Sequence, residues 1–178
     1  MANLRGYKDV DVMNADLVEK WNDTIQPKDE VWILGDVAFG PKEKAIPIIK
    51  GLHGQKTLIA GNHDAPWLLQ APLWVAVHKG FKSKRWSVEV PGQKKFQRYS
   101  AFCCHYPMLT WPNAHEGVFH LHGHSHGNLP PDNNTRIDVG IDATGQIAVS
   151  TEWVVEEMSK REYDKVDHHG NPKGYFGE

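Results

Sequence analysis

Cysteine is scarce in this chain, and the little that is present is badly placed for crosslinking. The two cysteines, Cys103 and Cys104, are neighbours in an expected strand. Consecutive strand residues point to opposite faces, so we do not expect a structural disulfide between them. Two reduced thiols are typical of proteins in a reducing compartment, and the sequence therefore predicts a cytoplasmic protein.

Long apolar runs and an excess of charge of one sign are missing as well. No apolar run approaches the ~20 residues that cross a bilayer, and the first residues, MANLRGYKDVD, lack the apolar stretch of a secretory signal. We therefore expect no membrane association. The 20 Lys and Arg residues nearly balance the 22 Asp and Glu residues, for a net charge of −2. Such a balance does not favour stable nucleic-acid binding.

Length and apolar patterning predict one α/β domain over residues 1–158, followed by a polar extension over 159–178. Helices are expected over 12–25 and 41–52, where apolar residues recur three or four positions apart. Strands are expected over 31–36, 56–64, 78–90, 99–107, 117–127, 136–143 and 146–151. A turn is expected at 92–95.

Histidine is the abundant component. The chain has eleven histidines, and six of them fall between residues 105 and 126. Within the segment HLHGHSHGN, an extended backbone would point His122, His124 and His126 to one side. Imidazole is the commonest metal ligand in proteins, so this clustering indicates a metal site.

Four of the expected strands end in polar residues. The motifs are Asp36, then Asn62-His63-Asp64, then His105, then His124-Ser125-His126. Strand ends of an open sheet gather at one edge, where α/β proteins build their sites. Each motif alone has a structural explanation, such as a turn or a half-buried histidine, but together they predict a metal site. Mixed imidazole and oxygen ligands suit Mn²⁺, Fe or Zn²⁺ better than Ca²⁺ or Mg²⁺.

The ordered motifs GDVAFG, GNHD, CCHYP and GHSHG resemble those of the calcineurin-like metallophosphoesterase superfamily, in particular its small single-domain bacterial and phage members. The resemblance extends from about Ala2 to Trp153. It implies two β-sheets packed face to face and flanked by helices, a four-layer sandwich with metals at the strand ends. Carried over residue by residue, it implies a second metal site of Asp36, Asn62, His105 and His124, a bridging role for Asp36, and a first site that includes His126.

The same resemblance implies roles beside the metals. His63 would act as general acid for the leaving oxygen or as a donor to the phosphoryl group. Asp64 would hold His63 in position and raise its basicity. His122 is expected to support or pack against the ligands, and His115 and His120 to be solvent or loop residues.

One family motif is missing, because the chain contains no Asp-x-His. In the family this motif ends the first strand and binds the first metal. We therefore expect the first strand to be absent, as a shortened or a natural form, and one or two divalent ions to bind, manganese before iron or zinc. An interior strand that is absent leaves unpaired sheet edges, through which a homo-oligomer could form.

The resemblance predicts a phosphoester hydrolase, with a phosphodiesterase favoured over a monoesterase. A metal-activated hydroxide would attack phosphorus while His63 assists the leaving group. The substrate would be a small phosphodiester, cyclic nucleotides included. The alternative is a metal-binding or assembly module with weakened catalysis on the same fold. Candidate surfaces for stacking on a base, each also compatible with a place in the core, are Trp67, Trp74, Trp86, Tyr106 and Trp111.

Overall fold

A computed structural model describes residues 2–89, 94–130 and 134–161, and shows a mixed α/β fold with two sheets. Residues 162–178 of the expected extension over 159–178 lie outside the described residues, as do residues 92 and 93 of the expected turn at 92–95. In chain order the elements are η1 (Asn3–Arg5), α1 (Val10–Thr24), β1 (Glu30–Ile33), α2 (Lys42–Gly51), β2 (Gln55–Ile59), α3 (Pro66–Gln70), β3 (Ala76–His78), β4 (Phe81–Glu89), β5 (Phe96–Cys104), η2 (Ala114–Glu116), β6 (Phe119–His122), β7 (Arg136–Asp138), α4 (Ile141–Thr144) and α5 (Thr151–Ser159).

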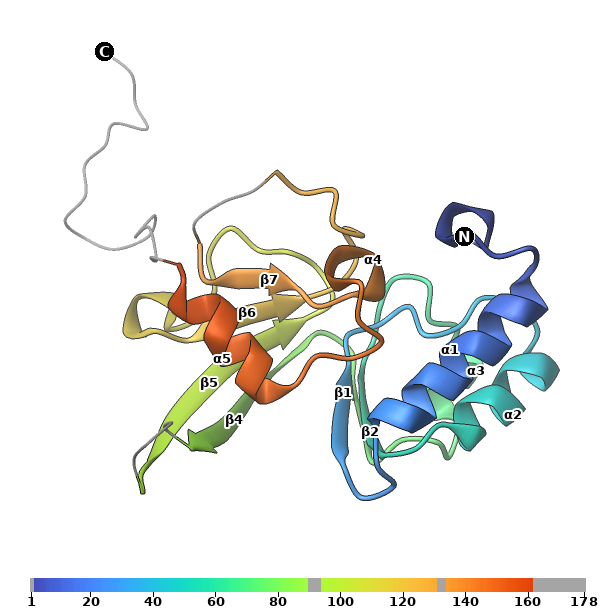
Figure 1. Cartoon of the computed structure of the whole chain (residues 1–178), viewed down its shortest axis with the longest axis horizontal. Coiled ribbons are helices and arrows are strands. Elements are labelled where there is room, and N and C mark those ends of the chain that lie inside the picture. The colour runs from blue at the N-terminus through green and yellow to red at the C-terminus, as the bar shows by residue number, and fades with distance from the viewer. Residues whose placement is uncertain (1, 90–93, 131–133, 162–178) are drawn as a thin grey trace, which may run out of the picture.

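The first sheet is parallel, with strand order β1-β2-β3. Helix α2 connects β1 to β2, as a parallel pair requires. Figure 1 shows α1 and α2 side by side, with the first sheet between them and the second sheet. Asp9 caps α1 by accepting a hydrogen bond from the Val12 backbone amide (2.8 Å). Strand β2 is buried over Lys56–Ile59 because both of its edges are paired.

The second sheet has the order β4-β5-β6-β7. Strands β4 and β5 form a long antiparallel pair, and β5, β6 and β7 run parallel. The parallel pairing of β5 with β6 brings the C-terminal ends of these two strands together. Residues that follow β1 and β2 in the first sheet meet residues that follow β5 and β6 in the second sheet.

The core lies where the two sheets meet. Leu34 and Ile59 from the first sheet pack in one cluster with Cys103 and Phe119 from the second sheet and Met158 from α5. Helix α5 thus covers the shared core, as Figure 1 shows, where it crosses β4 and β5. Burial of each large apolar side chain in this cluster contributes about 1.5–3 kcal/mol.

The opposite face of the second sheet has its own apolar cluster. Phe102 and Cys104 on β5 pack against Trp111 and Ala114, which belong to the segment that leads through η2 to β6. Cys103 and Cys104 therefore point to opposite faces, and both thiols are free. This confirms the expectation from sequence. Burial raises the pKa of the Cys103 thiol to about 12, so this thiol stays protonated.

Up to β6 the expected elements are confirmed in part. The segment expected as one strand over 78–90 divides between β3 and β4, which belong to different sheets, and the segment 117–127 is a strand only over Phe119–His122. Two later expectations are wrong. The alternating segment 136–143 is a strand only over Arg136–Asp138, after which it turns into the short helix α4. The strand expected over 146–151 is absent, and Thr151 begins helix α5 instead. Ser150 caps this helix by accepting a hydrogen bond from the Trp153 amide (3.1 Å), and Val154 and Met158, four residues apart, are buried.

The sheet edges differ in how they are covered. Strand β1 has one strand neighbour among the described residues, β2, so it is an edge strand of the first sheet. The outer edge of β7 is partly covered, because the Arg161 guanidinium donates to the carbonyl oxygens of Arg136 (2.5 Å) and Asn134 (3.4 Å). A side chain that occupies edge carbonyls hinders the addition of another strand. Pairing of chains through sheet edges stays a prediction, for which β1 is the better candidate.

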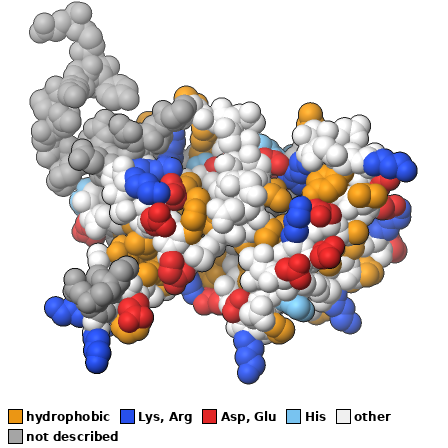
Figure 2. All heavy atoms as spheres, in the orientation of Figure 1, with side chains coloured by type: hydrophobic (Ala, Val, Ile, Leu, Met, Phe, Trp, Pro, Cys, Tyr) orange, Lys and Arg blue, Asp and Glu red, His pale blue; other side chains and the backbone are white. Residues whose placement is uncertain are grey.

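Within the described part of the chain, no helix is both long enough and apolar enough to cross a membrane. On the face drawn in Figure 2, acidic and basic side chains alternate without a patch of one sign. This agrees with the small net charge of the chain.

Candidate metal centre

The first part of the site is the turn that follows β1. Gly35 (φ 91°) and Asp36 (φ 57°) both adopt left-handed backbone conformations. A Cβ atom on Gly35 would lie 2.5 Å from His105 Nδ1 and 2.5 Å from the Gly61 amide nitrogen. Only glycine allows this approach, so Gly35 lets the β1 turn contact both the β2 turn and His105.

Asp64 joins the turns after β1 and β2. Its carboxylate is nearly buried and accepts three backbone hydrogen bonds, from Gly61 (2.8 Å), Asp36 (3.0 Å) and Val37 (2.9 Å). In return, the His63 amide donates to Asp36 Oδ1 (2.9 Å). This exchange holds the Asp36 carboxylate in place and leaves Oδ2 facing the second sheet.

His105 follows β5 and is 1% exposed. Its Nδ1 lies 2.7 Å from the carbonyl oxygen of Leu34. A carbonyl oxygen only accepts hydrogen bonds, so Nδ1 carries the proton and donates. In the neutral ring, Nε2 then presents a lone pair. A backbone carbonyl that fixes the tautomer in this way is the usual support for a metal-binding histidine.

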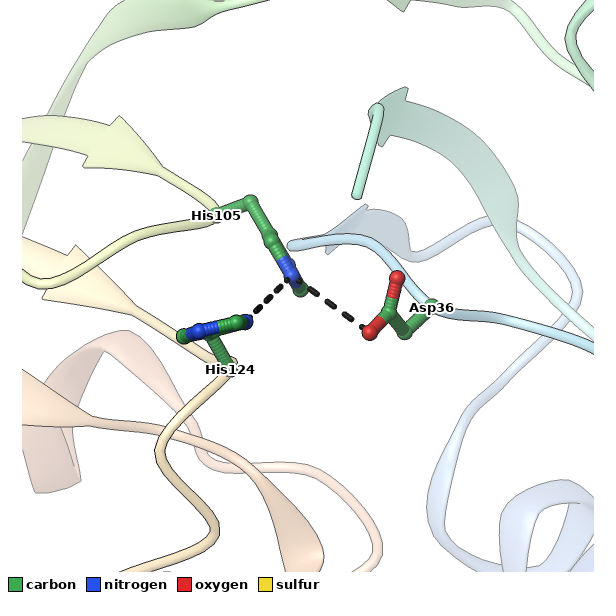
Figure 3. A group of neighbouring side chains, drawn as sticks. All are labelled: Asp36, His105 and His124. Atoms are coloured by element: carbon green, nitrogen blue, oxygen red, sulfur yellow. Dashed lines mark hydrogen bonds and ion pairs between the residues drawn. The ribbon is translucent and has the colours of Figure 1, made fainter. Parts of the chain in front are cut away.

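Four ligand atoms converge on one point. His105 Nε2 lies 2.9 Å from Asn62 Oδ1, 3.3 Å from His124 Nδ1 and 3.4 Å from Asp36 Oδ2. His124 Nδ1 lies 3.1 Å from Asn62 Oδ1. Figure 3 shows His105 and His124 approaching from the second sheet and Asp36 from the first. The three acidic and imidazole ligand atoms all lie within 4.8 Å of one another.

These separations fit a bound cation. Atoms about 2.1 Å from a metal are about 3.0 Å apart at a right angle and about 3.4 Å apart in a tetrahedron. The measured separations of 2.9–3.4 Å span this range. Lone pairs of two nitrogens and two oxygens so close together repel one another unless a cation or a proton lies among them. Asp36, Asn62, His105 and His124 could therefore hold one divalent ion.

Backbone strain is concentrated at the predicted ligands. Among the described residues, four non-glycine residues have positive φ: Asp36, Asn113, His124 (φ 67°) and His126 (φ 49°). Three of these four are predicted metal ligands. Such conformations cost about 1 kcal/mol or more each, and they are retained where a site requires them. The strain therefore supports a functional role for these turns.

Sequence comparisons find relatives among phage and archaeal proteins. No family model matches the chain. It is 27% identical over 183 residues to Gene 66 protein of Mycobacterium phage L5, a match that covers 90% of this chain and 84% of that protein. It is also 27% identical over 164 residues to an uncharacterized protein of Methanocaldococcus jannaschii, with 88% and 81% covered.

One solved structure has a similar fold. A protein of unknown function from Aquifex aeolicus superimposes with a TM-score of 0.53 at 21% sequence identity, over 79% of this chain and 82% of that one. At this identity the match shows the fold alone. It shows that the arrangement of this chain recurs in a crystal structure, and it names no activity.

His126 does not belong to the cluster of Asp36, His105 and His124. Its Nδ1 instead lies 2.6 Å from Asp142 Oδ2, and the Arg5 guanidinium holds both oxygens of the same carboxylate (2.6 and 2.8 Å). The hydrogen bonds from Arg5, and then the one from His126, lower the pKa of Asp142 to about 2. His126 is therefore oriented by a carboxylate, with Nε2 as its remaining nitrogen.

His63 is exposed, and its ring contacts the ring of Phe39 (centroids 5.2 Å apart). The prediction that Asp64 holds this imidazole is wrong, because the hydrogen bonds of Asp64 go to backbone amides at the two turns. A carboxylate beside a histidine in sequence can turn toward the backbone when several unpaired amides lie closer.

Of the remaining histidines, His122 behaves as predicted and His120 does not. His122 is 2% exposed at the end of β6. His120 is fully buried, donates from Nδ1 to the Phe102 carbonyl oxygen (2.9 Å) and accepts from the Met108 amide at Nε2 (3.1 Å). The sequence signal for its burial was its phase along β6, which it shares with His122. Because β6 ends at His122, His124 and His126 lie in turns and not on an extended strand.

Proposed function

We propose that this chain is a metal-dependent phosphoester hydrolase that acts on phosphodiesters, with the metallophosphoesterase arrangement of two sheets around a metal site. The observation that carries the proposal is the convergence of Asp36, Asn62, His105 and His124 on one point from four different turns. The donor set suits Mn²⁺, with Fe or Zn²⁺ as alternatives.

The position of the site in the fold is consistent with this proposal. Each of the four residues follows a strand, two in the first sheet and two in the second, so the cluster lies at the strand ends where the sheets meet. The same residues belong to the motifs that resemble the superfamily. The outer face of the second sheet is covered by the segment that contains η2, and the full four-layer sandwich remains part of the proposal.

The chain's own residues would divide the work as follows. Asp36 presents Oδ2 to the site while the His63 amide holds Oδ1. His105 presents Nε2 because Leu34 holds the proton on Nδ1. A bound divalent cation supplies Lewis-acid chemistry, which acidifies water and neutralises phosphoryl charge. The exposed His63 imidazole, on the turn that holds Asp36, would donate a proton to the leaving oxygen.

The experiment is hydrolysis of bis-p-nitrophenyl phosphate with Mn²⁺, combined with metal analysis of each protein. We expect the wild type to bind manganese and to turn over the substrate. His63→Ala should keep its metal and lose turnover. The loss should reach about 100-fold or more for a diester with an alkoxide leaving group, the usual contribution of a general acid, and be smaller for p-nitrophenolate, which leaves without a proton. His105→Ala should lose both metal and turnover, because it removes the buried ligand. His115→Ala, which removes an exposed imidazole outside the cluster, is the matched control.

Two results would contradict the proposal in different ways. Zero manganese per chain at saturating Mn²⁺ would refute the metal site itself. Normal manganese content without turnover above the level of His63→Ala would refute the hydrolase. That second result would favour a metal-binding or assembly module, for which the engagement of His126 by Asp142 and Arg5 is the supporting observation.

A further inference from the structure

Two exposed aromatic rings lie near the metal cluster, one against its histidines and the other against His63. Phe39 is 68% exposed and packs its ring against His63 (5.2 Å). Tyr106 is 45% exposed and presents its ring to His124 (4.7 Å) and His105 (5.0 Å) in edge contacts. Phe39 comes from the turn after β1 and Tyr106 from the turn after β5, so each sheet contributes one ring.

These two rings are more exposed than the apolar residues near them in sequence. Val37 and Ala38 pack into the apolar cluster with α2 and α3, whereas the next residue, Phe39, is left in water. Trp111, on the same segment as Tyr106, is 4% exposed. The fold can therefore bury apolar residues of these two segments, and it does not bury the two rings at the cluster. Exposed apolar surface next to polar ligand groups is typical of a binding site.

We infer that Phe39 and Tyr106 bind a flat aromatic group of the substrate, either a nucleobase or an aryl ring, while its phosphoryl group occupies the metal cluster. This inference rests on the proposed function and adds the substrate class. A ring face recognises any planar partner by stacking, without hydrogen bonds that specify one base. The aromatic group would therefore raise affinity, and its identity would matter less than its flatness.

The test measures equilibrium binding by titration calorimetry to the manganese-loaded protein, so it does not depend on turnover. The ligands are inorganic phosphate, methyl phosphate, phenyl phosphate and thymidine 5′-monophosphate. Stacking on an aromatic side chain raises affinity about 5- to 150-fold per base. We expect phenyl phosphate and thymidine 5′-monophosphate to bind at least about tenfold more tightly than methyl phosphate.

Variants then locate the effect. Phe39→Ala and Tyr106→Ala should each reduce the preference for phenyl over methyl phosphate to about threefold or less, with little change for inorganic phosphate. Tyr106→Phe keeps the ring and should keep the preference. Phe96→Ala is the matched control, because Phe96 is a comparably exposed phenylalanine (71%) at the start of β5.

The outcomes separate this inference from the proposed function. Equal affinity of the wild type for methyl and phenyl phosphate, or a preference that survives both alanine variants, would overturn the inference and leave the hydrolase intact. A manganese-loaded protein that binds none of the four phosphates would overturn both. Tighter binding of thymidine 5′-monophosphate than of phenyl phosphate supports the inference with a nucleobase as the group, and equal binding of the two supports it with any aryl ring.

Discussion

The buried imidazole of His120 gives a quantitative prediction about acid stability. The pKa of His120 is lowered from 6.5 to about 4, mainly because the ring is buried. The backbone carbonyl oxygens of Phe102 and Tyr106 oppose this shift, and the nearby His122 and Arg136 add to it. The folded protein therefore keeps this ring neutral at a pH where the unfolded chain protonates it. A second proton on Nε2 would also face the donating amide of Met108.

The sign and size follow from proton linkage. Between pH 6.5 and about 4 the unfolded state binds one more proton at His120 than the folded state, so the free energy of unfolding falls as the pH is lowered. Each pH unit costs up to about 1.4 kcal/mol, which adds to about 3 kcal/mol across the window. Above pH 6.5 both states are neutral at His120, and the effect ends.

The variant His120→Asn isolates this contribution. Asparagine retains a donor toward the Phe102 carbonyl oxygen but loses the acceptor for the Met108 amide, so we expect a loss of about 1–3 kcal/mol at pH 7. More telling is the slope of stability against pH. Between pH 4.5 and 6 the wild type should be steeper by about 1 kcal/mol per pH unit than the variant.

The assay is urea unfolding followed by tryptophan fluorescence at a series of pH values. EDTA is present throughout, so that release of a cation from the histidine ligands does not contribute to the slope. His115→Asn, which removes an exposed imidazole, serves as the control and should retain the wild-type slope. Equal slopes for His120→Asn and the wild type would refute the reasoning that a buried neutral ring makes this fold sensitive to acid.

Three further predictions concern the metal centre and its surroundings. Asp64→Asn replaces one acceptor of backbone amide hydrogen bonds by a donor, so the variant should bind manganese more weakly and turn over more slowly. Manganese affinity is measured by calorimetry, and an unchanged value would support a role of Asp64 for His63 alone. Gly35→Ala should lower manganese affinity at least about tenfold because its Cβ meets the ligand-bearing turns, whereas Gly40→Ala, also at positive φ but in open space, should not. Asp142→Asn should destabilise the protein by about 1 kcal/mol at pH 7, after allowance for solvent screening, and the deficit should shrink as the pH falls from about 4 toward 2, as urea unfolding would show.

The local sequence predicted the early part of the fold well. Helix α1 and strands β1 and β2 match the expected segments, because their apolar periodicity agrees with the faces that they bury. The later part was harder, since the run QIAVST resembles a strand while Ser150 and the spacing of Val154 and Met158 support a helix. The tertiary core decided between them, because the helix places both apolar residues in the cluster between the sheets.

The candidate site, too, was predicted from the sequence only in part. The candidate ligands and their order along the chain could be predicted from the sequence, because polar side chains follow four strands in succession, a combination that turns alone do not require. The roles of Asp64 and His120 could not. Each depends on which distant backbone groups the fold brings within hydrogen-bonding distance. The amides of Asp36 and Val37 lie 28 and 27 residues from Asp64, and the Met108 amide and Phe102 carbonyl oxygen lie 12 and 18 residues from His120.

By itself, then, the sequence determined which side chains carry donor atoms suited to a cation and where the early helices and strands lie, since these follow from side-chain chemistry and local spacing. Only the tertiary structure decided which atom of each ligand faces the site, that His126 pairs with Asp142, and that Phe39 and Tyr106 stay in water beside the cluster. The physical reason is that these outcomes depend on contacts between turns of different sheets, and no local pattern encodes the distance between such turns.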